Sequence, residues 1–313
     1  MATERVHIGV DVSKDNLDVF IPGGKWLRVR NTPAAVRRMV RGISTREPAA
    51  MFCCESTGGY ERKLLEVCRE EEASVCLMNA LQVRRYAEHR GLFEKTDKID
   101  ARVISLAADD KKPAPLVHAG ERQCRLRELW TLRTQLAGAR DAERNRLEHL
   151  REKEAVAAVR KLVALYDKQI AELERLCREA ASQDERAGTV MKRLQLVKGV
   201  GPLTALALAA LLPELLVLDD KRLAKLAGVA PLCDQSGTLD GPRHIQKGRG
   251  LVRRALFWAA LTASRRNKIL SAFYRRLLDA GKKKKVALVA VMRKLLCLLR
   301  LVAQNPDFVP AST

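Results

Sequence analysis

The chain has 313 residues, of which 47% are hydrophobic, so it is long enough for two or three small domains with real cores and too apolar for a disordered chain. Its formal net charge of +21 indicates a polyanionic partner, with nucleic acid favoured over an anionic membrane surface. The eight cysteines contain no CxxC pair and complete no zinc pattern with the five histidines, which argues against a zinc-finger protein.

The positive charge is concentrated in the C-terminal part of the chain. Residues 187–313 hold 23 Lys and Arg against 7 Asp and Glu, a net charge of +16. No signal peptide opens the sequence, and both long apolar stretches, 203–218 and 286–302, are interrupted by charged residues. We therefore expect a soluble, cytoplasmic protein with reduced cysteines and no membrane partner.

The first 110 residues alternate strand and helix signals. Apolar and polar residues alternate from Val6 to Val12, which is typical of a strand. Further strands are predicted at 17–22, 26–30, 49–54 and 74–78, and helices at 33–43, 60–71 and 82–89. This order predicts an α/β layer fold with a mixed sheet.

The middle of the chain is predicted to be helical. Residues 121–186 contain no proline, and apolar residues recur there at steps of three and four, at Val156, Val159, Val163, Tyr166, Ile170, Leu173, Cys177 and Ala180. This heptad pattern predicts a long helical hairpin or coiled coil with a turn near 150–155. Packing within the chain, oligomerisation and RNA contact all remain open as its role.

A helix-hairpin-helix is predicted at 196–205. Gly199 and Gly201 permit a tight turn, and Pro202 suits the first position of the next helix, whose free N–H groups can hold a phosphate. A plain connection between two helices is the alternative.

Four carboxylates form a candidate metal site. Asp11 and Glu55 lie at the ends of two predicted strands, and Asp97 and Asp100 are i, i+3 neighbours at the start of a predicted helix. Carboxylate oxygens suit Mg²⁺, and a pair of such ions can support phosphoryl transfer. For each residue alone, a structural role in a turn or at a helix start is the alternative. Their joint placement favours a shared site, because strand ends of α/β folds converge on one crevice.

A strand that ends in Gly-x-Asp-x-Ser also opens actin-like sugar kinases and ATPases. No Gly-rich phosphate loop of the Walker type accompanies it, and a basic tail is unusual for a sugar kinase. An actin-fold kinase is thus one alternative, and a nucleic-acid-binding protein without enzymatic activity, which uses only the basic tail, is another.

A candidate nucleophile, Ser236, precedes Gly237 in a predicted polar loop. A serine hydroxyl needs activation, and nearby guanidinium groups can orient a phosphate and neutralise developing charge. An ordinary loop serine is the alternative. The basic candidates for nucleic-acid contact that follow it are Arg243, Lys247, Arg249, Arg253 and Arg254.

Taken together, these motifs resemble those of the DEDD transposases of insertion sequences, a group of bridge-RNA-guided recombinases related to pilin-gene invertases. The resemblance covers nearly the whole chain. It is carried by HIGVDVSK (7–14), ESTGGY (55–60), KTDKIDA (95–101), GVGPLTA (199–205), GVAP (228–231), SG (236–237) and RRAL (253–256).

The resemblance implies a RuvC-like (RNase H-like) α/β domain at 1–115, a coiled-coil segment at 116–187 and an α-helical C-terminal transposase domain at 188–313. It maps Asp11, Glu55, Asp97 and Asp100 onto the acidic tetrad and Ser236 onto the nucleophile. It also implies a phosphoserine link to double-stranded DNA, a structured guide RNA, and a homo-oligomer, dimer or tetramer, with active sites shared between protomers.

Overall fold

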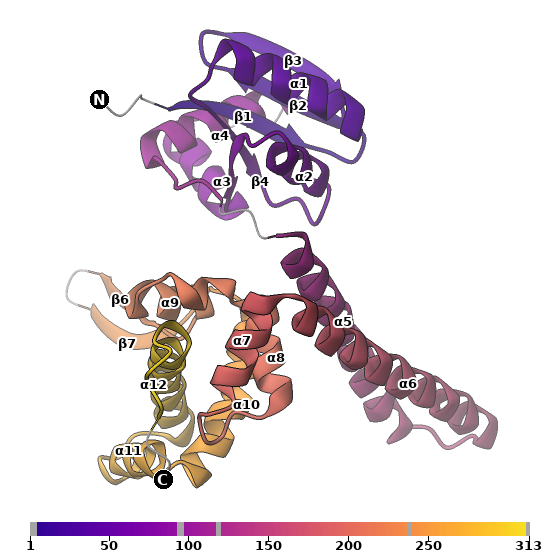
Figure 1. The fold of residues 1–313 in the computed structure, drawn as a ribbon, viewed down its shortest axis with the longest axis vertical. Coiled ribbons are helices and arrows are strands. Elements are labelled where there is room, and N and C mark those ends of the chain that lie inside the picture. Colours follow the sequence, from indigo (N-terminus) through magenta and orange to yellow (C-terminus); the bar gives the residue numbers. More distant parts are fainter. Residues whose placement is uncertain (1–4, 93–96, 117–119, 237–238, 311–313) are drawn as a thin grey trace. The chain divides into compact units, whose positions relative to one another are not determined.

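The computed structural model describes residues 5–92, 97–116, 120–236 and 239–310, and the side chains of 97–98 and 232–243 lie outside that description. The chain divides into two compact units, residues 1–118 and 119–313 (Figure 1). Each unit is described by itself.

The first unit contains five strands and four helices in its described part. In chain order they are β1 (Val6–Val12), β2 (Asn16–Ile21), β3 (Lys25–Arg30), α1 (Pro33–Arg46), β4 (Ala50–Glu55), α2 (Arg62–Glu70), β5 (Ser74–Met78), α3 (Ala80–His89) and α4 (Asp97–Lys111). All strands and helices predicted for residues 6–89 are present within three residues of their expected bounds.

The sheet of the first unit has the order β3-β2-β1-β4-β5. β1, β2 and β3 pair antiparallel, whereas β1, β4 and β5 pair parallel. Helices α1 and α2 pack on one face around Val10 and Phe52, and α3 and α4 pack on the other around Met51 and Met78 (Figure 1). The predicted α/β layer fold with a mixed sheet is confirmed.

Successive residues of a strand point to opposite faces of the sheet, and the cysteines follow this rule. Cys54 lies in the core under α1 and α2, and its neighbour Cys53 lies in the core under α3 and α4. Burial raises the pKa of the Cys54 thiol and of Cys68, the latter to about 12. These cysteines are free thiols that pack as small apolar side chains, as predicted.

The second unit is mostly helical. Its elements are α5 (Glu121–Leu147), α6 (Lys153–Gln183), α7 (Glu185–Leu194), α8 (Pro202–Leu211), η1 (Pro213–Leu216), α9 (Asp220–Ala227), β6 (Pro231–Ser236), β7 (Leu239–Ile245), α10 (Gly250–Arg266), α11 (Lys268–Asp279) and α12 (Lys284–Gln304). The described part of the chain contains no helix with the length and apolar character needed to cross a membrane.

Helices α5 and α6 form an antiparallel hairpin (Figure 1). The predicted apolar seam of α6 is its buried side, from the partly buried Val156 to the fully buried Cys177. Ion pairs from Arg133 to Glu174 and from Arg140 to Asp167 link the two helices. The helical hairpin is thus observed, with its turn at 148–152, and a supercoil stays a prediction.

The base of this hairpin shares a core with the C-terminal helices. Leu126 and Trp130 of α5 and Cys177 of α6 pack in one apolar cluster with Leu206 of α8 and Leu295 of α12. Because this core joins residues on both sides of position 187, the hairpin and the C-terminal helices form one compact unit. The division into three functional parts stays a prediction.

Candidate active site

Two of the four predicted acidic residues meet at one edge of the sheet. β1 and β4 are parallel neighbours, with Val10 opposite Cys54. Asp11 and Glu55 are the next residues of these two strands, so both carboxylates lie where the strands end. The sequence pattern predicted this convergence.

Helix α4 brings a third carboxylate to the same place, since Asp11, Glu55 and Asp100 all line one cavity of about 570 Å³. Its opposite wall is formed by α3, including Val83 and the exposed Arg84. Arg84, which was not predicted from the sequence, adds a basic group to the rim of this acidic cavity, 3.5 Å from a carboxylate oxygen of Glu88.

The close approach of α4 to β1 depends on Gly9. A Cβ atom at this position would lie 1.9 Å from the carbonyl oxygen of Ala101 and 2.8 Å from the backbone nitrogen of Ser105. Both distances are far below van der Waals contact, so only glycine lets the backbone of α4 pass this near to the strand. Ala101 follows Asp100, and hence this packing sets the position of that carboxylate.

Two side-chain contacts hold the same pair of elements together. The Ser105 hydroxyl donates a hydrogen bond of 2.7 Å to the carbonyl oxygen of His7 in β1. One turn further along α4, a carboxylate oxygen of Asp109 lies 3.2 Å from Nδ1 of the buried His7. These contacts fix the helix against the strand that carries Asp11.

A further buried carboxylate, Asp18, lies directly opposite Asp11 in the β1–β2 register. Cross-strand partners face the same side of a sheet, so Asp18 faces the α4 side with Asp11. Arg28, opposite Asp18 on β3, donates hydrogen bonds of 3.0 to 3.3 Å to both of its carboxylate oxygens. The guanidinium group neutralises Asp18, which the sequence analysis did not identify.

The carboxylates of the cavity repel one another. Burial, together with the negative charges of Asp11 and Asp100, raises the pKa of Glu55 to about 7. A site in which several acidic groups disfavour one another's ionisation is suited to a cation. The donor set, all carboxylate oxygen, fits a hard divalent ion.

Asp97, the fourth predicted ligand, is the first residue of α4, where the sequence placed a helix start, but its side chain lies outside the described residues. Among the side chains that the structure describes, no three His, Cys, Asp or Glu gather closely enough to hold one metal ion. The shared cavity is therefore observed, and the metal-binding role of the four residues stays a prediction.

Replacing Gly9 with Ala is expected to push α4 away from β1 and to displace Asp100. Overpacking of this kind costs about 1–3 kcal/mol of unfolding free energy, measured by urea denaturation. Any activity that depends on the position of Asp100 should fall even at temperatures where the variant remains folded. Gly42→Ala in α1 is the matched control, because a Cβ there meets no atom within 4 Å; a Gly9→Ala protein as stable and active as the Gly42→Ala protein would refute this packing argument.

Ser236 lies in the second unit, at the last position of β6. It pairs with Leu239 of β7, so it is at the tip of a two-stranded antiparallel hairpin. The sequence predicted a polar loop here, and this prediction is wrong for the backbone. Pro231, Asp234 and the Gly241-Pro242 pair interrupt the alternation that indicates a strand, and the register of the hairpin itself shifts between Leu232 and Asp234.

The basic residues predicted to contact nucleic acid differ in their partners. Arg249 pairs with the Glu214 carboxylate at 2.5 Å, and Arg253 donates a hydrogen bond of 2.6 Å to the carbonyl oxygen of Lys247. These two side chains therefore have partners within the fold. Arg254 is exposed and has no ion-pair partner among the described residues, and the Arg243 side chain lies outside the description. Nucleic-acid contact stays a prediction for all of them, Lys247 included.

The two helices and the turn predicted around 196–205 are present as α7, a turn and α8, with Pro202 at the first position of α8, so a helix-hairpin-helix and a plain connection between helices both stay open. Gly199 has a φ of +107°, and a Cβ on it would lie 2.7 Å from the Cα of Ala263 in α10. Packing thus requires this glycine, whereas Gly201 has open space around it. Phosphate binding by the turn stays a prediction.

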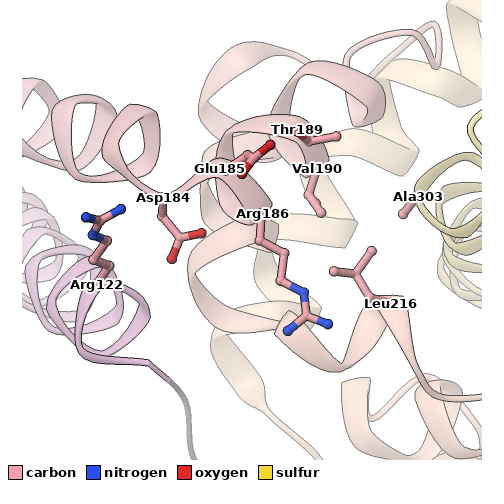
Figure 2. Close-up of a pocket in the computed structure, with 8 residues that line it drawn as sticks. All are labelled: Arg122, Asp184, Glu185, Arg186, Thr189, Val190, Leu216 and Ala303. Carbon is pink, nitrogen blue, oxygen red and sulfur yellow. The ribbon is translucent and has the colours of Figure 1, made fainter.

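A separate hollow of about 480 Å³ lies in the second unit, where α5, α7, η1 and α12 meet (Figure 2). Two of its polar groups have partners in the fold: Asp184 caps α7 through the Ala187 amide, and Arg122 donates to the carbonyl oxygen of Gln183. These two groups stabilise the fold, so the acidic cavity of the first unit is the better candidate.

Comparison with known families decides between the alternatives. A family model described as "Transposase" matches residues 8–153, and one described as "Transposase IS116/IS110/IS902 family" matches residues 191–275. The chain belongs to this transposase family. It is therefore an enzyme that cuts and rejoins DNA and binds DNA, and the kinase and non-enzymatic alternatives are set aside. DEDD nucleases use divalent metal ions, consistent with the carboxylates of the cavity.

Two relatives are similar to this chain over nearly its whole length. The transposase is 25% identical to the pilin gene-inverting protein of Moraxella lacunata and 27% identical to that of Moraxella bovis, over 97% of this chain and 98% of each relative. Among solved structures, RuvC from Thermus thermophilus aligns at 14% identity with a TM-score of 0.27, over 36% of this chain and 99% of RuvC.

Proposed function

We propose that this transposase is the recombinase of a bacterial insertion sequence, with Asp11, Glu55, Asp97 and Asp100 as ligands for Mg²⁺ and Ser236 as the nucleophile. One observation carries the acidic half of the proposal. Asp11, Glu55 and Asp100, which are far apart in the sequence, line one cavity at the end of parallel strands.

The residues of the cavity have separate tasks in this proposal. The carboxylates of Asp11, Glu55, Asp97 and Asp100 hold the cation, which when bound supplies a Lewis acid for phosphoryl transfer. Gly9 and Ser105 keep α4 against β1 and so keep Asp100 beside Asp11. Arg84 on the opposite wall attracts the phosphate backbone to a cavity that would otherwise repel it.

Ser236 gives the reaction its ability to rejoin DNA. Its Oγ forms a bond to a backbone phosphorus while one bond from that phosphorus to a deoxyribose oxygen breaks. The serine proton leaves to a base, and the released deoxyribose oxygen takes up a proton. The bond energy is retained in the phosphoserine ester, so a hydroxyl of another DNA end can displace the serine and reseal the strand.

Further partners belong to the same proposal. Residues 187–313 carry +16 of the +21 net charge, which suits binding to double-stranded DNA and to a structured guide RNA encoded by the element. The acidic residues and Ser236 belong to different compact units. In a homo-oligomer, dimer or tetramer, that shares its active sites, the serine of one protomer acts with the acidic residues of another.

The metal part is tested by Glu55→Gln. Because the pKa of Glu55 is raised to about 7 in the fold, the folded protein binds more protons than the unfolded chain between about pH 4.5 and 7. Stability is therefore lost as pH rises through this window, and the full penalty remains above it. Glu55→Gln should raise the unfolding free energy of the metal-free protein at pH 8 by about 1–2 kcal/mol, discounted for partial exposure.

Mg²⁺ should stabilise the wild type more than Glu55→Gln, the opposite of the order expected without metal. The ion is expected to raise the Tm of the wild type at pH 8 and to raise that of Glu55→Gln much less, as measured by calorimetry. Towards pH 4.5 the difference between the two metal-free proteins should shrink. An equal rise in Tm for both proteins on addition of Mg²⁺ would remove Glu55 from the metal site.

A further inference from the structure

A groove of about 320 Å³ lies between α5, α8 and α10 in the second unit. Its walls are made in part by small residues, which leave the space between the helices open. They are Thr134, Ala137, Gly138, Thr204, Ala207 and Ala255. The residues of the groove include none of the predicted catalytic residues, and only Arg254 was singled out from the sequence.

The outer part of the groove carries an exposed tryptophan. Trp258 is 59% exposed, and its ring packs edge-to-face on Phe257, with 5.4 Å between the ring centroids. Tryptophan is usually well buried in folded proteins. A large aromatic ring held at the edge of a groove, with much of its surface in solvent, indicates a binding surface.

The charges around the groove indicate an anionic ligand. Arg254 lies one helical turn before Trp258, so both side chains are on the same face of α10. Arg133 and Arg140 also line the groove, though both are paired with acidic residues of α6. Arg254 is exposed and has no acidic partner among the described residues, so its charge is available to a ligand.

We infer that this groove binds an unpaired nucleotide, with its base stacked on Trp258 and its phosphate at Arg254. The groove is too small for a duplex, and the bases of a duplex hide their faces from an aromatic ring. Bases of single strands, bulges and loops expose theirs, and aromatic stacking with a nearby arginine is how proteins hold them. The choice of nucleic acid as the ligand rests on the proposed function, whereas the choice of an unpaired base rests on Trp258.

The test compares three labelled probes on the full-length protein by fluorescence anisotropy: single-stranded oligo(dT), oligo(rU) of the same length, and a blunt DNA duplex. Trp258→Ala should weaken binding of a single-stranded probe by about tenfold or more, the usual contribution of one stacked base. Duplex binding, which depends on phosphate contacts, should stay within about twofold. If Trp258→Ala loses affinity for oligo(rU) alone, the unpaired nucleotide belongs to RNA, and if it loses affinity for oligo(dT) alone, the nucleotide belongs to DNA. Loss of affinity for both probes supports a groove that stacks an unpaired base of either nucleic acid.

Two control variants keep the test specific. Trp258→Phe retains a stacking ring and should bind the single strands nearly as well as the wild type. Val217→Ala removes another highly exposed apolar side chain, outside the groove, and should leave the affinity for all three probes unchanged. Three results for Trp258→Ala would each overturn the inference. They are unchanged affinity for single strands, an equal loss of affinity for the duplex, and conversion of an oligomer to a smaller species in light scattering. None of these results would affect the roles of Asp11 and Ser236, which strand-transfer assays test separately.

Discussion

Replacing Asp11 with Ala is expected to lower the rate of DNA strand transfer in Mg²⁺ by about 10³-fold or more, the scale seen when a central catalytic group is removed. Asp11 is at the end of β1, lines the cavity with Glu55 and Asp100, and contributes to the raised pKa of Glu55. Asp100→Asn should have a similar effect, because it removes the charge while it keeps the size of the side chain.

Binding of DNA provides the internal control for both variants. Most of the net positive charge lies in residues 187–313, far along the chain from Asp11, so the affinity measured by anisotropy should change little. Asp15→Ala is the matched variant, since it removes an exposed carboxylate that does not line the cavity. Full strand-transfer activity of Asp11→Ala in Mg²⁺ would remove the acidic cavity from the mechanism.

Replacing Ser236 with Ala is expected to abolish strand exchange while leaving DNA binding and the Mg²⁺-induced rise in Tm intact. The reason is that the serine oxygen would carry the phosphate between the two DNA partners, whereas the metal ligands lie in the other unit. Exchange is measured as recombinant product from two labelled duplexes. Ser182→Ala, an exposed serine of α6, is the control. Recombinant product from Ser236→Ala at the wild-type rate would exclude this serine.

A mixture of the two inactive proteins tests whether sites are shared. Asp11→Ala supplies an intact serine and Ser236→Ala supplies intact carboxylates. If one protomer's serine works with another protomer's acidic residues, the mixture should recover part of the strand exchange. Failure to recover activity would count against shared sites and would leave both residue assignments in place.

Much of the first unit could be predicted because its signals are local. Alternation from Val6 to Val12 and the apolar run before Glu55 predicted two strands, and strand ends of α/β folds converge on one crevice. The buried seam of α6 was equally readable from its steps of three and four. These local patterns are sufficient to predict that Asp11 and Glu55 lie close together.

The remaining features depend on contacts between residues that are distant in sequence. The need for glycine at position 9 appears only when α4 lies across β1, and the pairing of Asp18 with Arg28 requires the β2–β3 register. The β6–β7 hairpin was missed because its strands lack apolar alternation. Likewise, Trp258 reads as an ordinary apolar residue of α10 until its exposure is seen.

The most direct test of the whole mechanism is a denaturing gel of end-labelled DNA after incubation with the protein. Wild-type protein in Mg²⁺ should give a slow band of DNA joined covalently to protein, and protease should remove that band. Ser236→Ala should give no such band, and neither should Asp11→Ala or the wild type in a metal chelator. A covalent adduct that persists in Ser236→Ala, or one that forms without divalent metal, would contradict the proposed cooperation of the serine with the acidic site.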